Sequence, residues 1–153
     1  MAKPSVKWLK SAWLSKMDII GRRELIHLPE WGGFFIPAKI DTGAFRTAVH
    51  CESCIEIQSP DGPKLQVTFD WEGDGKLQII ETSQYKKRII KNSFGQTEER
   101  YCLRTIVKIG AKSIRSEISL TDRSGMKYPV LLGRKTIGKK FLVDVSKINL
   151  QVF

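Results

Sequence analysis

The sequence predicts an all-β domain, a barrel or a sandwich, and three observations lead to this fold class. Short runs rich in β-branched and aromatic residues recur along the chain. Turn signals built from glycine, proline, aspartate and serine separate these runs at regular intervals. Little room is left between the runs for helices, as is typical of small all-β folds. The 153 residues, 41% of them hydrophobic, suit one domain with a core of its own.

The expected strands can be followed in order from Ile19 onward. The segment 19–28 alternates until Pro29 and the Gly32-Gly33 pair break it, and the segment 34–40 then runs into Asp41. The other strand segments are expected at 55–58, 64–69, 76–83, 87–93, 100–109, 112–120, 128–133 and 140–145. The turns between them lie at 59–62, 72–75, 94–95, 110 and 124–125, and each contains glycine. The stretch 134–137 predicts one short helix near the C-terminus.

Residues 1–18 read as a basic N-terminal extension, and residues 19–153 as the domain itself. Apolar residues recur in the extension at helical spacing, at Val6, Leu9, Trp13 and Met17, which predicts a short amphipathic helix. We expect this helix to pack on the domain, and a membrane-surface or partner-binding arm is the alternative. The extension lacks the apolar stretch and cleavage site of a secretory signal. No apolar run approaches a membrane span, so a cytoplasmic protein is expected.

The charge balance is strongly basic, with 26 Lys and Arg against 16 Asp and Glu, a formal net charge of +10. Such an excess invites an anionic partner: nucleic acid, anionic lipid or an acidic protein. The basic residues are spread along the chain, which is typical of solvated surface. Aromatic residues do not cluster with them as a base-stacking platform would require, so nucleic acid is not the expected partner.

Two motifs carry the functional argument. The apolar segment 34–40 ends in Asp41, Thr42 and Gly43, with the small Ala44 next, so a carboxylate is presented at a strand end. A structural turn with no catalytic role would use the same residues, because the Asp side chain can cap the backbone of the turn and Gly permits positive φ. The second motif, 128–138, places Leu132 and Gly133 directly before Arg134 and the expected helical turn. A glycine there lets one segment pass close behind another.

Together the two motifs resemble the retroviral-type aspartic proteases. They are more similar still to a bacterial family of retropepsin-like peptidases, whose members are often labelled ATP-dependent zinc proteases. The matching stretches are IIGRRELIHLPEWG, IPAKIDTGAFRTAVHC, EERYCLRTIVKIG, ISLTDRSGMKYPVLLGRKTI and FLVDVS, which together extend from Ile19 to Ser146.

The resemblance implies a closed β-barrel with one Asp-Thr-Gly per chain. A homodimer would then be needed to bring two copies of Asp41 together as an aspartic-type endopeptidase. Thr42 would hydrogen-bond across the dimer, Gly43 would allow the close approach, and Gly133 would shape the loop packed behind the site. The stretch 84–96 is the predicted flap.

Arg134 departs from the viral pattern. In the viral relatives this arginine pairs with an acidic residue just past Asp-Thr-Gly-Ala, where this chain has Phe45 and Arg46. We therefore expect another partner for Arg134, namely Asp122, Asp144 or the C-terminus of a neighbouring subunit.

The family is also associated with ATP-grasp glutamate ligases that modify a ribosomal protein. By that resemblance, a functional link to such a ligase is expected, and a basic cleft would suit an acidic or glutamylated protein substrate. A different class of function stays open: a non-catalytic basic β-barrel that binds RNA or an acidic protein tail. Asp41 distinguishes the peptidase from the binding module, because only the peptidase needs this residue.

The zinc and ATP in the family's label find little support in the residues. His50, Cys51 and Cys54 are close in sequence, but a structural zinc site commonly uses paired Cys or Cys/His units, and no second pair is present. Cys102 and His27 lie elsewhere in the sequence and do not form a second pair of ligands. No Gly-rich phosphate loop of the Walker type occurs. No metal and no cofactor is expected, and the odd number of cysteines, three, does not suggest a disulfide framework.

Overall fold

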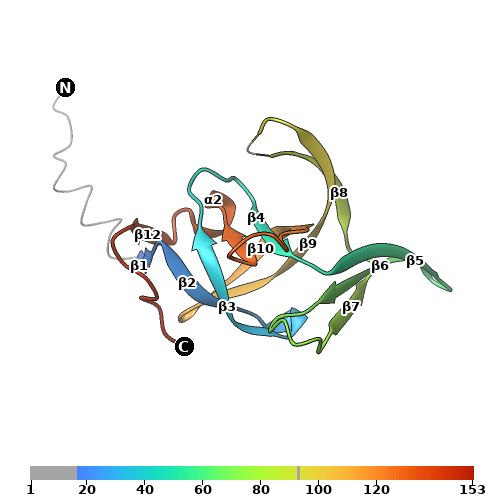
Figure 1. The fold of residues 1–153 in the computed structure, drawn as a ribbon, viewed down its shortest axis with the longest axis horizontal. Coiled ribbons are helices and arrows are strands. Elements are labelled where there is room, and N and C mark those ends of the chain that lie inside the picture. The colour runs from blue at the N-terminus through green and yellow to red at the C-terminus, as the bar shows by residue number, and fades with distance from the viewer. Residues whose placement is uncertain (1–16, 93) are drawn as a thin grey trace, which may run out of the picture.

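The structure of the chain, a computed structural model, describes residues 17–92 and 94–153 (Figure 1). Its strands are β1 (Asp18–Gly21), β2 (Arg23–Leu28), β3 (Gly33–Ile40), β4 (Thr47–His50), β5 (Ser53–Ser59), β6 (Gly62–Phe69), β7 (Gln78–Thr82), β8 (Lys86–Lys91), β9 (Thr97–Ile109), β10 (Lys112–Thr121), β11 (Val130–Leu132) and β12 (Phe141–Asp144). A 3-10 helix, η1 (Pro29–Trp31), follows β2, and the short helix α2 (Arg134–Ile137) precedes β12. The predicted all-β class and C-terminal helical turn are confirmed.

Six strands close into a barrel in the order β10, β4, β11, β3, β2 and β9, with the β9–β10 pairing completing the ring. The short strand β11 lies between β3, to which it is parallel, and β4, to which it is antiparallel. Parallel pairing of β3 and β11 brings the ends of both strands to the same rim. The closed barrel implied by the resemblance is therefore confirmed, and the Asp-Thr-Gly turn and the Gly133-Arg134 step follow strands that end at the same rim.

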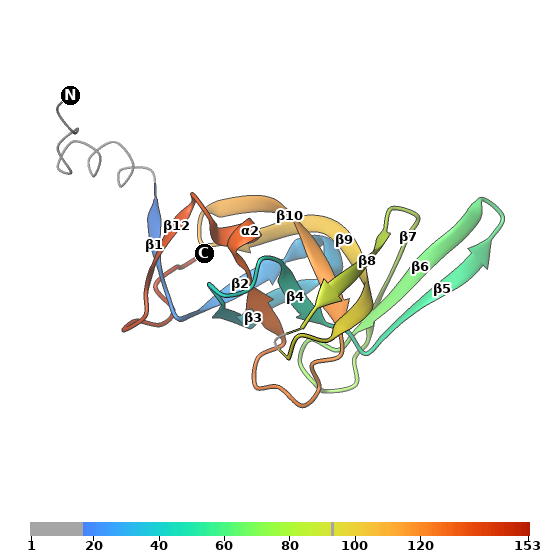
Figure 2. The same cartoon turned by 90° about the horizontal axis from the view of Figure 1, so that it is seen from above.

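One strand, one separate sheet and one long-range strand pairing were not expected from the sequence. The strand β4 was missed because its four residues follow the Asp-Thr-Gly turn without a clear alternating pattern. The strands β5, β6 and β7 form a separate sheet, which extends away from the barrel in Figure 2. The strands β1 and β12, far apart in sequence, pair in parallel.

The core fills the barrel because the strands alternate as their sequences do. In β3, for example, Ile36, Ala38 and Ile40 are buried while the residues between them face outward. An aromatic stack connects this core to the separate sheet. The rings of Trp31 and Phe69 lie 5.3 Å apart, and those of Phe69 and Trp71 lie 4.4 Å apart. The three-stranded sheet is thus packed on the barrel by large apolar side chains.

The C-terminal tail is fastened back onto the barrel by a buried carboxylate. Glu24, only 1% exposed, accepts hydrogen bonds from the backbone N–H groups of Gly21 (2.8 Å), Leu150 (3.0 Å) and Gln151 (2.8 Å). A buried charged group needs such partners. Of the predicted extension 1–18, residues 1–16 and their expected helix lie outside the described residues, and β1 begins at Asp18.

Candidate active site

Asp41 lies at the rim of the barrel, directly after β3, and its side chain is half-buried. Its backbone N–H donates to the carbonyl of Leu132, the last residue of β11, at 2.9 Å. Its carboxylate atom Oδ1 accepts a hydrogen bond from the N–H of Gly43 at 3.0 Å, and its carbonyl accepts one from Ala44 at 3.2 Å. The Asp-Thr-Gly turn therefore fixes one oxygen of the carboxylate and leaves the other without a backbone donor.

The second motif passes directly behind this turn. The N–H groups of Arg134 and Lys135 each donate at 2.9 Å, to the carbonyls of Ala44 and Phe45. A Cβ at Gly133 would lie 2.5 Å from the carbonyl oxygen of Arg46, which is closer than real contacts allow. Only glycine permits the two segments to cross this closely.

Arg134 binds the turn itself. Its Nη1 donates to the carbonyl oxygen of Thr42 at 3.0 Å, and its guanidinium lies 5.9 Å from the ring centre of Phe45. Within the described part of the chain, Arg134 forms no ion pair with either of the carboxylates that we had expected. Asp122 and Asp144 instead accept hydrogen bonds from Ser124 and Ser146. The two carboxylates of the same chain are therefore not its partners, and the carbonyl of Thr42 binds the guanidinium locally, while the C-terminus of a neighbouring subunit stays a prediction.

A buried chain of hydroxyl groups supports the crossing from below. Thr47 Oγ1 accepts a hydrogen bond from the N–H of Gly133 at 3.1 Å and lies 2.6 Å from Thr136 Oγ1, which lies 2.8 Å from Ser116 Oγ. All three residues are buried. No sequence pattern predicts them, since single Thr and Ser residues give no signal until the fold brings β4, α2 and β10 together.

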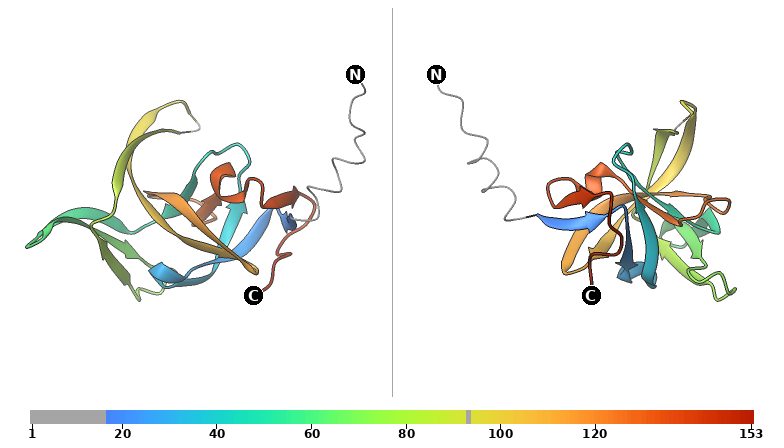
Figure 3. Two further views of the ribbon diagram at one scale, coloured as in Figure 1. Left: turned by 180° about the vertical axis from the view of Figure 1, so that it is seen from behind. Right: turned by 60° about the vertical axis from the view of Figure 1, so that its left-hand side comes forward.

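A cavity of about 740 Å³ opens at Asp41. Its lining includes Gly43, Ala44 and Phe45 from the turn, and it continues along residues 89–92, 94, 98 and 100 of the hairpin formed by β8 and β9. Figure 1 and the left view of Figure 3 both show this hairpin arching above the barrel, with its tip directed toward the loop after β3. It occupies the stretch predicted to be the flap.

The base of the hairpin is attached to the barrel by an ion pair. Glu117 on β10 is 6% exposed and accepts hydrogen bonds from Arg88 on β8, at 2.5 Å from Nε and 3.0 Å from Nη2. Arg46 approaches the same carboxylate at 3.4 Å. The hydrogen bonds from Arg88 lower the pKa of Glu117 and, reciprocally, raise that of Arg88.

Two further arginines, Arg100 and Arg123, line the cavity that contains Asp41. Arg100 pairs with Glu98, its neighbour on β9. Arg123 lies in the loop after β10, where its N–H donates to His50 Nδ1 at 2.8 Å and its Nε donates to the carbonyl of Tyr128 at 3.1 Å. Burial, followed by the charge of Arg100, lowers the pKa of Arg123, while the charge of Asp41 raises it. Arg123 thus lies within electrostatic reach of the candidate catalytic carboxylate.

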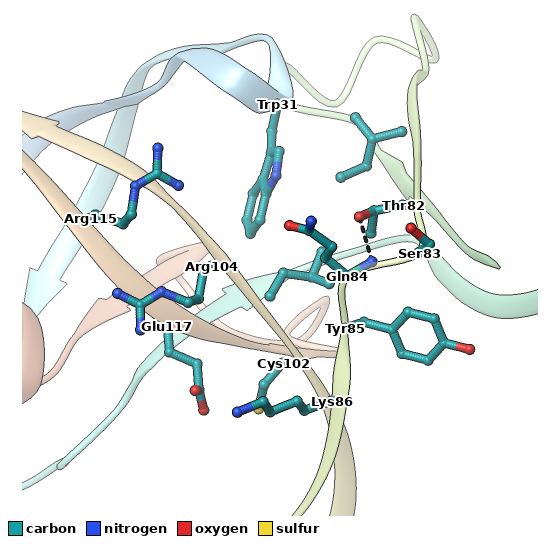
Figure 4. A pocket seen from close by; sticks show the side chains of 12 residues that line it. Trp31, Thr82, Ser83, Gln84, Tyr85, Lys86, Cys102, Arg104, Arg115 and Glu117 are labelled. Carbon is teal, nitrogen blue, oxygen red and sulfur yellow. Dashed lines mark hydrogen bonds between the residues drawn. The ribbon is translucent and has the colours of Figure 1, made fainter. Parts of the chain in front are cut away.

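A second cavity, of about 430 Å³, lies away from Asp41 (Figure 4). Figure 4 shows Trp31 and Thr82 at one end of this view, and Lys86 and Glu117 at the other. Its one lining carboxylate, Glu117, is already bound by Arg88. This cavity therefore offers no free carboxylate for hydrolysis.

The cysteines and histidines are engaged in separate contacts. His50 Nδ1 accepts from Arg123, so its Nε2 carries the proton donated to Glu52 at 2.9 Å. Cys51 and Cys54 contact each other, and this hydrogen bond lowers the pKa of the Cys51 thiol. No group of three or more His, Cys, Asp or Glu side chains able to hold a metal ion is found among residues 17–92 and 94–153.

A closed barrel whose rim carries the two crossed loops places this chain in the retropepsin-like fold class. The sequence matches, over residues 19–153, the family described as the retropepsin-like aspartic endopeptidase RimB. The chain belongs to this RimB-like family. None of the helices in the described ranges is long and apolar enough to cross a membrane.

Similar proteins carry two kinds of description. This chain is similar to three proteins named probable alpha-L-glutamate ligase. The one from Shewanella pealeana is 30% identical over 84% of this chain, the one from Parasynechococcus marenigrum 29% identical over 86%, and the one from Desulfotalea psychrophila 32% identical over 82%. The matched region makes up only 28–29% of these longer proteins. A crystal structure of a protein of unknown function from Legionella pneumophila is 26% identical, with a TM-score of 0.70 over 87% of this chain and 97% of that one.

Proposed function

We propose that the chain is an aspartic-type endopeptidase that acts as a homodimer. The observation that carries the proposal is Asp41, held at the rim of a RimB-like barrel and open to a cavity beneath a hairpin. One carboxylate per chain cannot supply both the acid and the base of the reaction. A second copy of Asp41 from another subunit would complete the pair.

Two carboxylates brought so close cannot both ionise, so they share one proton and titrate as a unit. The ionised carboxylate acts as the general base on a water molecule, which attacks the peptide carbonyl carbon. The protonated carboxylate donates to the carbonyl oxygen, and a proton then passes to the leaving amine as the C–N bond breaks. The N–H of Gly43 holds Oδ1 of Asp41 in place, and in the proposed dimer Thr42 would hydrogen-bond to the other subunit.

Acidic or glutamylated protein substrates are part of the proposal. The support is the net charge of +10, the arginines beside Asp41, and the relatives named glutamate ligases. A glutamate ligase is accordingly the proposed functional partner.

The test is cleavage of a peptide mixture by the wild-type protein and by Asp41→Asn, from acidic to neutral pH. Asparagine keeps the shape of aspartate but cannot share the proton, so we expect the cleavage rate to fall at least about 100-fold. Asp61→Asn, which alters an exposed carboxylate in the β5–β6 turn, serves as the control and should cleave like the wild type. Equal cleavage by the wild type and Asp41→Asn, or none by either, would contradict the proposal.

The second candidate is a non-catalytic basic binding module. It is favoured by the observation that the matched region is a minor part of longer relatives named as ligases, where such a domain could recruit an acidic substrate. Under this alternative, Asp41→Asn would bind an acidic peptide as well as the wild type does, and neither would cleave it.

A further inference from the structure

We propose that Cys51 and Cys54 form a reversible dithiol–disulfide pair, a modification site that fixes the joint between the barrel and the three-stranded sheet. A hydroperoxide is the co-reactant that forms the disulfide, and a dithiol reductant is the one that reopens it. The site uses neither a peptide substrate nor Asp41, so its chemistry is independent of the proposed peptidase activity.

The two cysteines lie on either side of the joint. Cys51 follows the barrel strand β4, and Cys54 is the second residue of β5, which belongs to the separate sheet that extends away from the barrel in Figure 2. The N–H of Cys51 donates to the carbonyl of Thr121 on β10 at 3.1 Å, which holds it to the barrel. The chain then bends at Glu52, whose N–H donates to the carbonyl of Thr68 on β6 at 2.8 Å. The chain therefore passes from the barrel to the separate sheet within two residues.

The two thiols already contact each other across this bend. Both cysteines are free, Cys51 is buried in the hydrophobic core, and the half-buried Cys54 packs against the same core. Their side chains share a hydrogen bond, in which the Cys54 thiol donates to the sulfur of Cys51. A disulfide needs two cysteines that are close together and aimed at each other, and a hydrogen-bonded pair meets this requirement.

The three thiols of the chain differ in reactivity. The hydrogen bond from Cys54 stabilises the Cys51 thiolate and lowers the pKa of Cys51, while the same bond, followed by burial, raises the pKa of Cys54. Cys102 is buried away from this pair, and burial raises the pKa of its thiol. The thiolate is the nucleophilic form of cysteine, so we expect a peroxide to react first at Cys51.

The reaction converts two thiols and one peroxide into one disulfide and two waters. The Cys51 thiolate attacks one oxygen of hydrogen peroxide, the O–O bond breaks, and the hydroxide that leaves takes up the proton lost by Cys51. The sulfur of Cys54 then attacks Sγ of the Cys51 sulfenic acid, and an S–S bond replaces the S–O bond as the second water leaves with the Cys54 proton. The two sulfurs are oxidised and the peroxide is reduced by the same two electrons.

The experiment exposes the folded, reduced protein to a small excess of hydrogen peroxide, then unfolds it and alkylates every remaining thiol for peptide mass spectrometry. We expect Cys51 and Cys54 to escape alkylation as one disulfide, and a dithiol reductant to restore both thiols. Cys102 should be modified at least about tenfold more slowly than the pair. Cys54→Ser should form no disulfide at this joint, and the matched control Cys102→Ser should form it at the wild-type rate.

Hydrogen–deuterium exchange measures the effect on the joint. In the oxidised wild type, the backbone amides of residues 52–54 should exchange at least about threefold more slowly than in the reduced protein. Residues 73–75, in the exposed loop between β6 and β7, should exchange equally in both forms. Cys54→Ser, treated with peroxide in the same way, should show no change at residues 52–54.

Equal modification of Cys102 and the pair would overturn the proposal, because the oxidation would then be unselective. Cys51 and Cys54 that stay reduced, or that pass to sulfinic acid without an S–S bond, would overturn it as well. A disulfide that leaves exchange at 52–54 unchanged would reject its role at the joint. The comparison with Cys102 is made within the wild-type chain, so it decides even where a serine variant fails to fold. Failure of the proposed function would appear only in cleavage assays and would leave these results unchanged.

Discussion

Gly133 is the residue at which the two loops of the site come closest. A Cβ there would meet the backbone oxygens of Arg46 and Phe45, at 2.5 and 2.9 Å. Backbone atoms of a buried crossing cannot swing aside as a flexible side chain can. The Asp-Thr-Gly turn would have to move away from β11, and the hydrogen bonds that position Asp41 would be lost with it.

We therefore expect Gly133→Ala to lower the free energy of unfolding by about 1–3 kcal/mol, the usual cost of overpacking. Gly125→Ala is the matched control, because a Cβ at Gly125 meets nothing within 4 Å. Its effect should stay within about 0.5 kcal/mol. Urea unfolding of the two variants and the wild type measures both values. Similar stabilities for Gly133→Ala and Gly125→Ala would mean that the crossing is looser than its geometry indicates.

The residues of the site differ in how far the sequence predicts them. Asp41, Gly43 and Gly133 belong to short motifs whose chemistry is local, so their neighbours in sequence are also their neighbours in space. Arg123 and Glu117 acquire their roles only through contacts with β9, β8 and β4, which no local pattern specifies. The contact of Arg134 with the carbonyl of Thr42 was not predicted for a related reason, because a backbone carbonyl carries no sequence signal.

At the scale of elements, an ion pair at the base of the β8–β9 hairpin ties it to the barrel, and another, between Lys87 and Glu56, ties it to β5. Apart from the ladder that joins the two strands, the contact of Arg88 with Glu117 ties β8 to the barrel strand β10. Arg46, which lies between the turn after β3 and the strand β4, contacts the same carboxylate of Glu117, so these three side chains form one charged group. Loosening this group would free the predicted flap and, with it, one wall of the Asp41 cavity.

The Glu117 contact should make stability depend on pH. Because Arg88 lowers the folded-state pKa of Glu117, the contact stabilises the fold above the unfolded-state pKa of about 4.3 and loses its effect as pH falls through the folded-state pKa. Glu117→Gln should therefore be less stable than the wild type near neutral pH, and the difference should shrink in acid. Urea unfolding at a series of pH values measures it.

Asp61→Asn is the control for this experiment, since it removes an exposed carboxylate from the β5–β6 turn. Its difference from the wild type should be small at neutral and acidic pH alike. A Glu117→Gln difference that stays constant from neutral to strongly acidic pH would show that Glu117 contributes through packing rather than through its charge.

The all-β fold class and the strand positions could be predicted from the sequence, but the pairing and packing of the strands could not. Ten strand segments follow from alternation and glycine-containing turns, and the structure places strands within each of them. The segment 19–28 divides into two strands, β1 and β2, and β4 lies outside all of the segments. The division into a barrel and a separate sheet rests on packing such as the Trp31, Phe69 and Trp71 stack. Long-range pairing of β1 with β12 likewise depends on contacts that periodicity does not encode.

At the scale of the whole molecule, the proposed dimer faces an electrostatic cost. Each chain carries a formal net charge of +10. In the loops that would have to meet, Arg46, Arg134 and Lys135 surround the ring of Phe45 at 5.4, 5.9 and 5.7 Å from its centre. Bringing two copies of Asp41 together therefore also brings two basic clusters together. Repulsion of this kind is screened by salt, because the Debye length shortens as ionic strength rises.

We therefore expect the dimer to tighten as salt is added, which is the opposite of a dimer held by ion pairs between subunits. Sedimentation at about 50 mM and about 500 mM NaCl, where the Debye length falls several-fold, measures the dissociation constant. Lys135→Gln should strengthen the dimer at low salt and reduce the salt dependence. Lys76→Gln, which removes the same charge from the exposed loop between β6 and β7, should do neither. Weaker association at high salt would place the contact between subunits on a different face, and two copies of Asp41 would then not meet in this way.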